Sequence, residues 1–156
     1  MSRSVNRVEA ALEAAQVDAD VREMSAPTRT AVEAAVAAGC TVDQIAKSIL
    51  FRGDESGQLY LFITAGGNSV CLQKAGALAG EPLGKADADQ VREETGFAIG
   101  GVAPIGHLRT PRAFFDPRLR DFDLVWAAAG TPRHIFSISP ETLFRISGAE
   151  SADFVA

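Results

Sequence analysis

One lysine lies where lysines are rarely found, within an apolar stretch typical of a β-strand. Residues 44–52 alternate as a strand does, which would place Lys47 on one face with three large apolar side chains, Ile45, Ile49 and Phe51. An unpaired ammonium is costly to bury. Lys47 is therefore either an edge-strand lysine whose head reaches water, or a cationic anchor in a cleft that binds a phosphate, ester or carboxylate oxygen.

A glycine-punctuated segment, residues 96–106, carries few polar side chains. Glycines let backbone N–H groups approach a ligand closely, and consecutive N–H groups can bind an anion. Such a loop can stabilise an oxyanion without any catalytic side chain. The plain alternative is a connection whose glycines satisfy tight turns.

His134 and an arginine-rich segment are weaker candidates. His134 begins a predicted strand, where it could bind a substrate or position a water, or only satisfy local backbone groups. Residues 107–120 hold four arginines, of which Arg109 and Arg112 could contact nucleic-acid phosphates, unless the segment is simply a solvated surface.

Other reaction types find little support in the residue inventory. The chain has two histidines, and its two cysteines, Cys40 and Cys71, lack the spacing of a zinc site, so we expect no metal and two free thiols. No GxSxG motif points to a serine hydrolase, and no Rossmann or Walker fingerprint is present.

The elements that must position these residues follow from periodicity and from turn signals. A capping box at Thr30–Glu33 predicts a helix start, and the loop 53–57 suits a hairpin. Helices are expected near residues 5–15, 30–38, 73–79, 87–95 and 140–147, and strands near 17–24, 44–52, 58–64, 69–72, 122–128 and 134–138. This order predicts an α+β fold, a single domain over residues 1–156 with a mixed, mostly antiparallel sheet flanked by helices.

Composition limits the partners. Lys plus Arg number 15 and Asp plus Glu 20 in 156 residues, a net charge of −5. This balance argues against a broad basic surface that coats DNA, RNA or a membrane, but not against contact with one short nucleic-acid end. The N-terminus lacks the apolar run of a signal peptide, and no stretch approaches about 18 apolar residues. We expect a cytoplasmic protein.

Three stretches together resemble the YbaK/EbsC family, free-standing relatives of the editing domain inserted in bacterial prolyl-tRNA synthetases. Residues 44–51 are similar to the family's lysine strand, and residues 95–106 to its "TGF…GGV.P.G" loop. Residues 129–135, followed by Ser139-Pro140, are similar to its C-terminal hairpin and final helix. The resemblance covers roughly residues 5–149.

The resemblance implies a YbaK-like fold and the hydrolysis of a mischarged aminoacyl-tRNA at its 3′ end. The implied substrate is tRNA-Pro carrying a small amino acid such as alanine, cysteine, serine or threonine. No cofactor, metal, DNA or membrane is implied. Whether a prolyl-tRNA synthetase delivers the substrate stays open.

The resemblance also implies roles for individual residues. The family's essential lysine corresponds to Lys47, and backbone N–H groups near Gly100 and Gly101 would stabilise the oxyanion. The expected substrate-binding positions are Thr30, Ser48, Val102, Ala103, Pro104 and His134. Some relatives carry asparagine or threonine where this chain has Ser48, which leaves the amino-acid preference open.

Two other functions remain compatible with the same residues. One is a non-catalytic module of the same fold that binds a tRNA end or a protein. The other is a small-ester hydrolase that uses the same cleft without tRNA.

Overall fold

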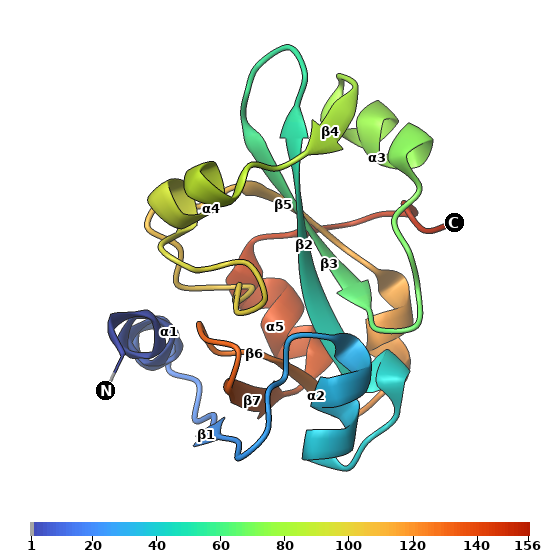
Figure 1. Ribbon diagram of the computed structural model, residues 1–156. Coiled ribbons are helices and arrows are strands. Elements are labelled where there is room, and N and C mark those ends of the chain that lie inside the picture. Colours follow the sequence, from blue (N-terminus) through green and yellow to red (C-terminus); the bar gives the residue numbers. More distant parts are fainter. Residues whose placement is uncertain (1) are drawn as a thin grey trace.

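Strands β2 (Ile45–Gly53) and β3 (Leu59–Ala65) form an antiparallel hairpin at the centre of the computed structural model, which describes residues 2–156 (Figure 1). Every residue of β3 is buried. Its aromatic and β-branched side chains suit a pleated surface that is covered on both faces. The hairpin expected from the sequence is confirmed.

Six further strands complete one mixed sheet. The order is β1-β7-β6-β2-β3-β5-β8, and β4 pairs with β2. Four strand pairs are antiparallel and three are parallel, as the predicted fold class requires. These strands are β1 (Val21–Glu23), β4 (Leu83–Lys85), β5 (Arg112–Phe115), β6 (Val125–Ala128), β7 (His134–Ile138) and β8 (Glu150–Ser151).

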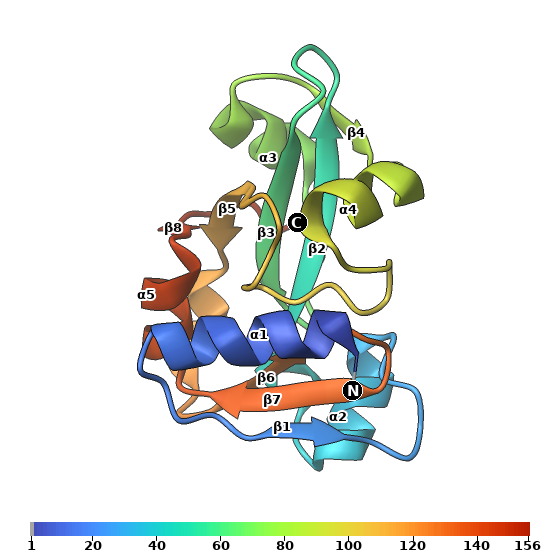
Figure 2. The ribbon, with the colours of Figure 1, turned by 90° about the vertical axis from the view of Figure 1, so that its left-hand side faces the viewer.

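Five α-helices surround the sheet. They are α1 (Arg3–Ala14), α2 (Ala31–Ala38), α3 (Leu72–Ala79), α4 (Ala88–Thr95) and α5 (Pro140–Ser147), with 3-10 turns η1 (Val42–Gln44) and η2 (Pro117–Asp121). Helix α2 begins at the predicted capping box and ends at Gly39, whose φ of 74° few other residues adopt. Figure 2 shows α1 running alongside β7, with the segment after α4 descending toward the helix.

The central hairpin separates two apolar clusters. One contains side chains of α1, α4 and α5, such as Val8, Val91 and Leu143. On the opposite face, Phe62 stacks on Phe114 at 5.2 Å and meets Phe154 edge-on at 5.0 Å. A third, smaller cluster lies beneath α2. Burial on both faces explains why the hairpin occupies the middle of the sheet.

Several predicted elements need correction. The expected strand at 69–72 is wrong: Val70 makes one isolated bridge to Val155, and Cys71 caps α3 instead. Strands β4, β5 and β8 were not predicted, and β1 is shorter than the expected 17–24. Over the part of the chain described here, no helix has the length and apolar character needed to span a membrane.

Candidate functional site

A cavity of about 340 Å³ opens beside β2, where α2, β6 and the glycine-rich segment converge. Five of the residues expected in the site line it: Thr30, Lys47, Ser48, Gly100 and Val102. They come from segments far apart in the sequence. The fold therefore brings the predicted lysine strand and glycine loop to one place.

The cavity adjoins a gap in the sheet. On the edge of β2 opposite β3, strand β6 pairs only with residues 45–46 and β4 only with residues 51–53. The intervening residues 47–50 have no neighbouring strand there. Gly53 donates to Gln58 at the hairpin end, so by alternation the N–H and C=O of Ser48 point toward this open edge. Backbone groups of β2 are thus available to a ligand.

Lys47 is half-buried in the cavity wall. Its Nζ donates to the carbonyl oxygen of Gly66 at 3.2 Å. Burial lowers the pKa of Lys47, while the negative charges of Asp116 and Asp43 act in the opposite direction. An ammonium has three donors, so two remain for a ligand once Gly66 is satisfied.

Ser48 presents an unused hydroxyl. Its Oγ is buried and has no hydrogen-bond partner among residues 2–156. Leaving such a group unpaired costs about 1–3 kcal/mol. The residue Ser48 lines the cavity, but its Oγ is covered, so a ligand in the cavity can pair with this oxygen only if the side chain rotates.

The mouth of the cavity is formed by the start of α2. Thr30 is engaged in the helix cap, where its Oγ1 accepts from the Glu33 N–H at 3.1 Å. The preceding Arg29 also lines the cavity, and a Cβ placed on Gly100 would lie 3.4 Å from its Cγ. The sequence-based prediction missed Arg29. The available signal was its position directly before the capping box, where a positive charge lies at the start of a helix. Among residues 2–156 no acidic side chain lines the cavity, while Arg29 and Lys47 do, so its charge favours an anionic ligand or an oxygen that carries partial negative charge.

The two adjacent glycines of the loop have different surroundings. Gly100 lines the cavity with φ of +94°, a conformation that side-chain-bearing residues rarely adopt. Gly101 is buried, and its N–H donates to the Ala98 carbonyl at 3.0 Å. A Cβ on Gly101 would lie 2.6 Å from the carbonyl carbon of Thr131. Gly101 therefore packs the loop against the β6–β7 hairpin, and its N–H is already used inside the loop.

Three expected substrate-binding residues lie outside the cavity lining. Ala103 is buried, and its carbonyl pairs with His107 Nε2 at 2.7 Å. Burial lowers the pKa of His107 and favours the neutral ring, whose Nε2–H is then the donor. Pro104 lines a separate small hollow, and His134 Nδ1 pairs with Thr131 Oγ1. These residues support the loop and the hairpin rather than the cavity surface.

Arg109 and Arg112 lie together in a second hollow of about 480 Å³, beside residues 56–59. Arg112 is 3.6 Å from a carboxylate oxygen of Glu150 and stacks over a phenylalanine ring. Part of its charge is thus already compensated. The two arginines form a surface separate from the cavity.

Apolar side chains from α2 and the sheet complete the cavity wall. The sequence-based site did not include them: Ala34, Ile45, Trp126 and Ile135. The alternation of residues 122–128 was the available signal, because it predicts Trp126 and Ala128 on one face. Cys40 and Cys71 carry free thiols, as expected. Within residues 2–156, no three His, Cys, Asp or Glu side chains gather as a metal site.

Comparison with known proteins gives consistent matches. Residues 25–146 match the family model described as "Aminoacyl-tRNA editing domain". The uncharacterized protein YwhH of Bacillus subtilis (strain 168) is 32% identical over 128 residues, which cover 82% of this chain and 81% of YwhH.

Two solved structures match over the whole chain. One, described as a candidate trans-editing enzyme for prolyl-tRNA synthetase, is 46% identical with a TM-score of 0.92, covering 100% of this chain and 99% of that chain. The other, from a study that grafts epitopes onto scaffold proteins by computational design, is 41% identical with a TM-score of 0.91, at the same coverage.

Proposed function

Because this chain belongs to the aminoacyl-tRNA editing domain family, we propose that it hydrolyses the ester bond of a mischarged tRNA in trans. The proposed substrate is tRNA-Pro carrying a small amino acid such as alanine, cysteine, serine or threonine. The observation that carries the proposal is the single cavity shared by Lys47, Ser48 and Gly100. The similarity to a candidate trans-editing enzyme for prolyl-tRNA synthetase supports the choice of tRNA.

The size and lining of the cavity agree with a small aminoacyl group. Its volume of about 340 Å³ is near the lower end of ligand sites, which span roughly 300–1,000 Å³. The apolar wall of Ala34, Ile45 and Trp126 would exclude larger side chains by contact. One methylene in such a pocket discriminates by about 1–3 kcal/mol, which suits selection by size.

The reaction needs few protein side chains. A water oxygen adds to the ester carbonyl carbon, the bond from that carbon to the ribose oxygen breaks, and the ribose oxygen leaves with a proton. The products are the free amino acid and the 3′-terminal hydroxyl. The neighbouring 2′-hydroxyl of the substrate would assist the proton transfers.

Lys47 and Gly100 are the proposed catalytic groups. The ammonium of Lys47 would bind the ester carbonyl oxygen or the terminal phosphate. The N–H of Gly100 would stabilise the oxyanion, a contribution typically worth about 10²–10³ in rate. Gly101 would act by holding the loop, since its N–H donates to Ala98. The open backbone edge of β2 at Ser48 would orient the aminoacyl group, and the Ser48 hydroxyl would join it after a side-chain rotation.

A deacylation panel tests the proposal. Purified protein is incubated with tRNA-Pro charged with alanine, cysteine, serine or threonine, and in parallel with other mischarged tRNAs. We expect faster release of at least one small amino acid than in buffer. A binding module of the same fold would bind tRNA without turnover. A general ester hydrolase would cleave aminoacyl esters without tRNA at comparable efficiency.

A further inference from the structure

The ammonium of Lys47 is placed by a tight turn that follows β3. Its only hydrogen bond within residues 2–156 is to the carbonyl of Gly66, which lies in the turn 65–68. The turn is closed by the Asn68 N–H donating to the Ala65 carbonyl at 2.9 Å. Gly66 is packed so closely that an added Cβ would collide with the carbonyl oxygen of Val42. The position of this turn therefore decides where the Lys47 head lies.

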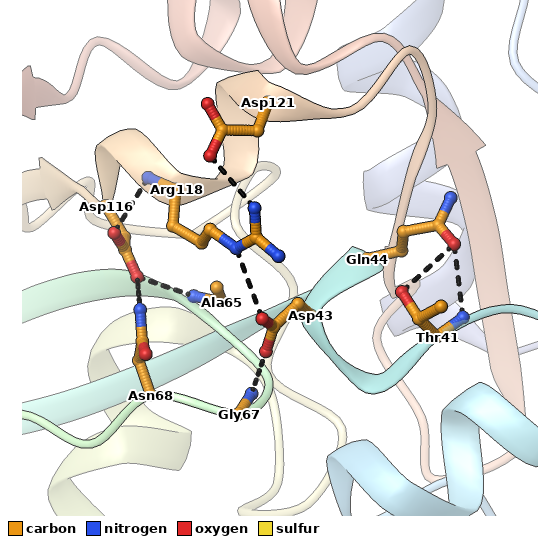
Figure 3. A network of polar contacts seen from close by, with 9 residues as sticks. All are labelled: Thr41, Asp43, Gln44, Ala65, Gly67, Asn68, Asp116, Arg118 and Asp121. Atoms are coloured by element: carbon orange, nitrogen blue, oxygen red, sulfur yellow. Dashed lines mark hydrogen bonds and ion pairs between the residues drawn. The ribbon is translucent and has the colours of Figure 1, made fainter.

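Two carboxylates hold the turn from opposite sides (Figure 3). Asp116 Oδ2 accepts from the Ala65 N–H at 3.1 Å and from Asn68 Nδ2 at 2.9 Å. Asp43 Oδ1 accepts from the Gly67 N–H at 2.9 Å. Between them they bind three of the four residues of the turn.

The two carboxylates are themselves fixed by one arginine (Figure 3). Asp116 is 2% exposed, and its Oδ1 accepts from the backbone N–H of Arg118 at 3.0 Å. Asp43 Oδ2 accepts from Arg118 Nε at 3.2 Å. The guanidinium also bonds Asp121 at 3.0 Å. Arg118 thus ties η1, the turn and η2 into one unit.

Within the part of the chain that the structure describes, the charged groups that face Lys47 are two carboxylates and one arginine. Asp43 comes from η1 and Asp116 from the end of β5, while Arg29 precedes α2. The parts of β6, β7 and the glycine-rich segment that line the cavity contribute no charged side chain. Since β3 presents only uncharged residues, the two carboxylates supply the nearby negative charge.

We propose that Asp116 and Asp43 are positioning residues for Lys47, acting through the turn 65–68. They set where the Gly66 carbonyl meets the ammonium, and their charges favour its protonated form. The catalytic value of this arrangement rests on the proposed function. The positioning of Lys47 by the two carboxylates does not depend on that function, so an experiment can test each claim separately.

Nuclear magnetic resonance of the lysine side chains gives that separation. The chain has three lysines, Lys47, Lys74 and Lys85, so a sample labelled with ¹³C-lysine yields three side-chain signals, and Lys47→Arg assigns the first. The signals are followed against pH in the wild type, Asp116→Asn and Asp43→Asn. The matched control is Asp121→Asn, because Asp121 binds the same arginine but makes no hydrogen bond to the turn.

The proposal predicts one pattern. In Asp116→Asn and Asp43→Asn the pKa of Lys47 falls by about half a unit or more, and kcat falls about tenfold or more with a smaller change in KM. The signals of Lys74 and Lys85 do not move, and Asp121→Asn behaves as the wild type. Asp43 is partly exposed and serves as the second variant if the buried Asp116→Asn does not fold.

An unchanged Lys47 titration in the folded Asp43→Asn and Asp116→Asn variants would overturn the proposal, whatever their activity. If the wild type shows no deacylase activity but the pKa of Lys47 still falls in the two variants, the proposed function is overturned and the positioning role stands.

Discussion

Replacing Gly101 by alanine tests whether the glycine loop owes its place to the β6–β7 hairpin. The added Cβ would lie 2.6 Å from the Thr131 carbonyl carbon and 3.0 Å from the Pro132 nitrogen. Both are backbone atoms and cannot rotate away. Because ordinary contacts begin at 3.4 Å, the loop and the hairpin must separate by about 0.8 Å.

That separation has two measurable consequences. Overpacking of this kind costs about 1–3 kcal/mol, which lowers the Tm of a chain this size by roughly 2–12 °C. The movement also displaces Gly100 and Val102 relative to Lys47, which lines the same cavity. A misplacement near 1 Å can cost about 10²-fold in rate, so kcat/KM for deacylation should fall roughly 10- to 100-fold.

The assay compares thermal melts and deacylation rates of three proteins. The control is Gly80→Ala, whose φ of +83° makes alanine strained but whose Cβ meets no atom within 4 Å. Gly80 ends α3, at the far end of the hairpin from α2 (Figure 1). It should lose about 1–2 kcal/mol of stability and keep its activity. A Gly101→Ala protein with wild-type Tm and rate would refute the packing argument.

Three further results are expected. Ala34→Val narrows the cavity and should reduce turnover of the largest accepted amino acid by about 10-fold or more while sparing alanine; an unchanged size preference would contradict the proposed wall. Glu81 accepts four hydrogen bonds that lower its pKa from 4.5 to about 2. The stabilising effect of the Glu81 carboxylate is therefore present above pH 4.5 and lost as the pH falls toward 2. The difference in Tm between wild type and Glu81→Gln should close over that range. A difference in Tm that stays constant with pH would contradict this role of the carboxylate. The double variant Arg109→Ala/Arg112→Ala should weaken tRNA binding and flatten its salt dependence, with Arg145→Ala as the control; an unchanged salt slope would make the second hollow an ordinary charged surface.

The central parts of the fold could be predicted because their signals are local. Residues 44–52 alternate as a strand does, residues 58–64 form an apolar strand-like run, and a glycine-containing loop joins them, while Thr30 and Glu33 form a capping box. Strand β5 was missed because residues 112–115 are short and sit among arginines, so the segment resembled a charged surface. The false strand at 69–72 has strand-forming residues, but Cys71 donates its N–H to Phe154 and caps a helix instead. Whether residues 69–72 form a strand or lead into a helix thus depends on a contact with the C-terminal segment, which is remote in the sequence.

The candidate site was predictable to a similar degree. Lys47 and Gly100 stand out by residue type, and the cavity contains both. Asp116 did not stand out, because an aspartate between arginines looks solvated. Its 2% exposure arises only when the segment after β5 folds over the turn 65–68. Burial created by tertiary packing leaves no trace in the local sequence.

The rate of amino-acid release from mischarged tRNA-Pro, measured for the wild type and Lys47→Ala, tests the central claim most directly. The wild type should release at least one small amino acid faster than buffer does. Lys47→Ala should be folded, bind tRNA and lose about 10²–10³ of that rate, the effect of removing one donor to the developing charge. A wild type inactive on every mischarged tRNA, or a fully active Lys47→Ala, would contradict the account.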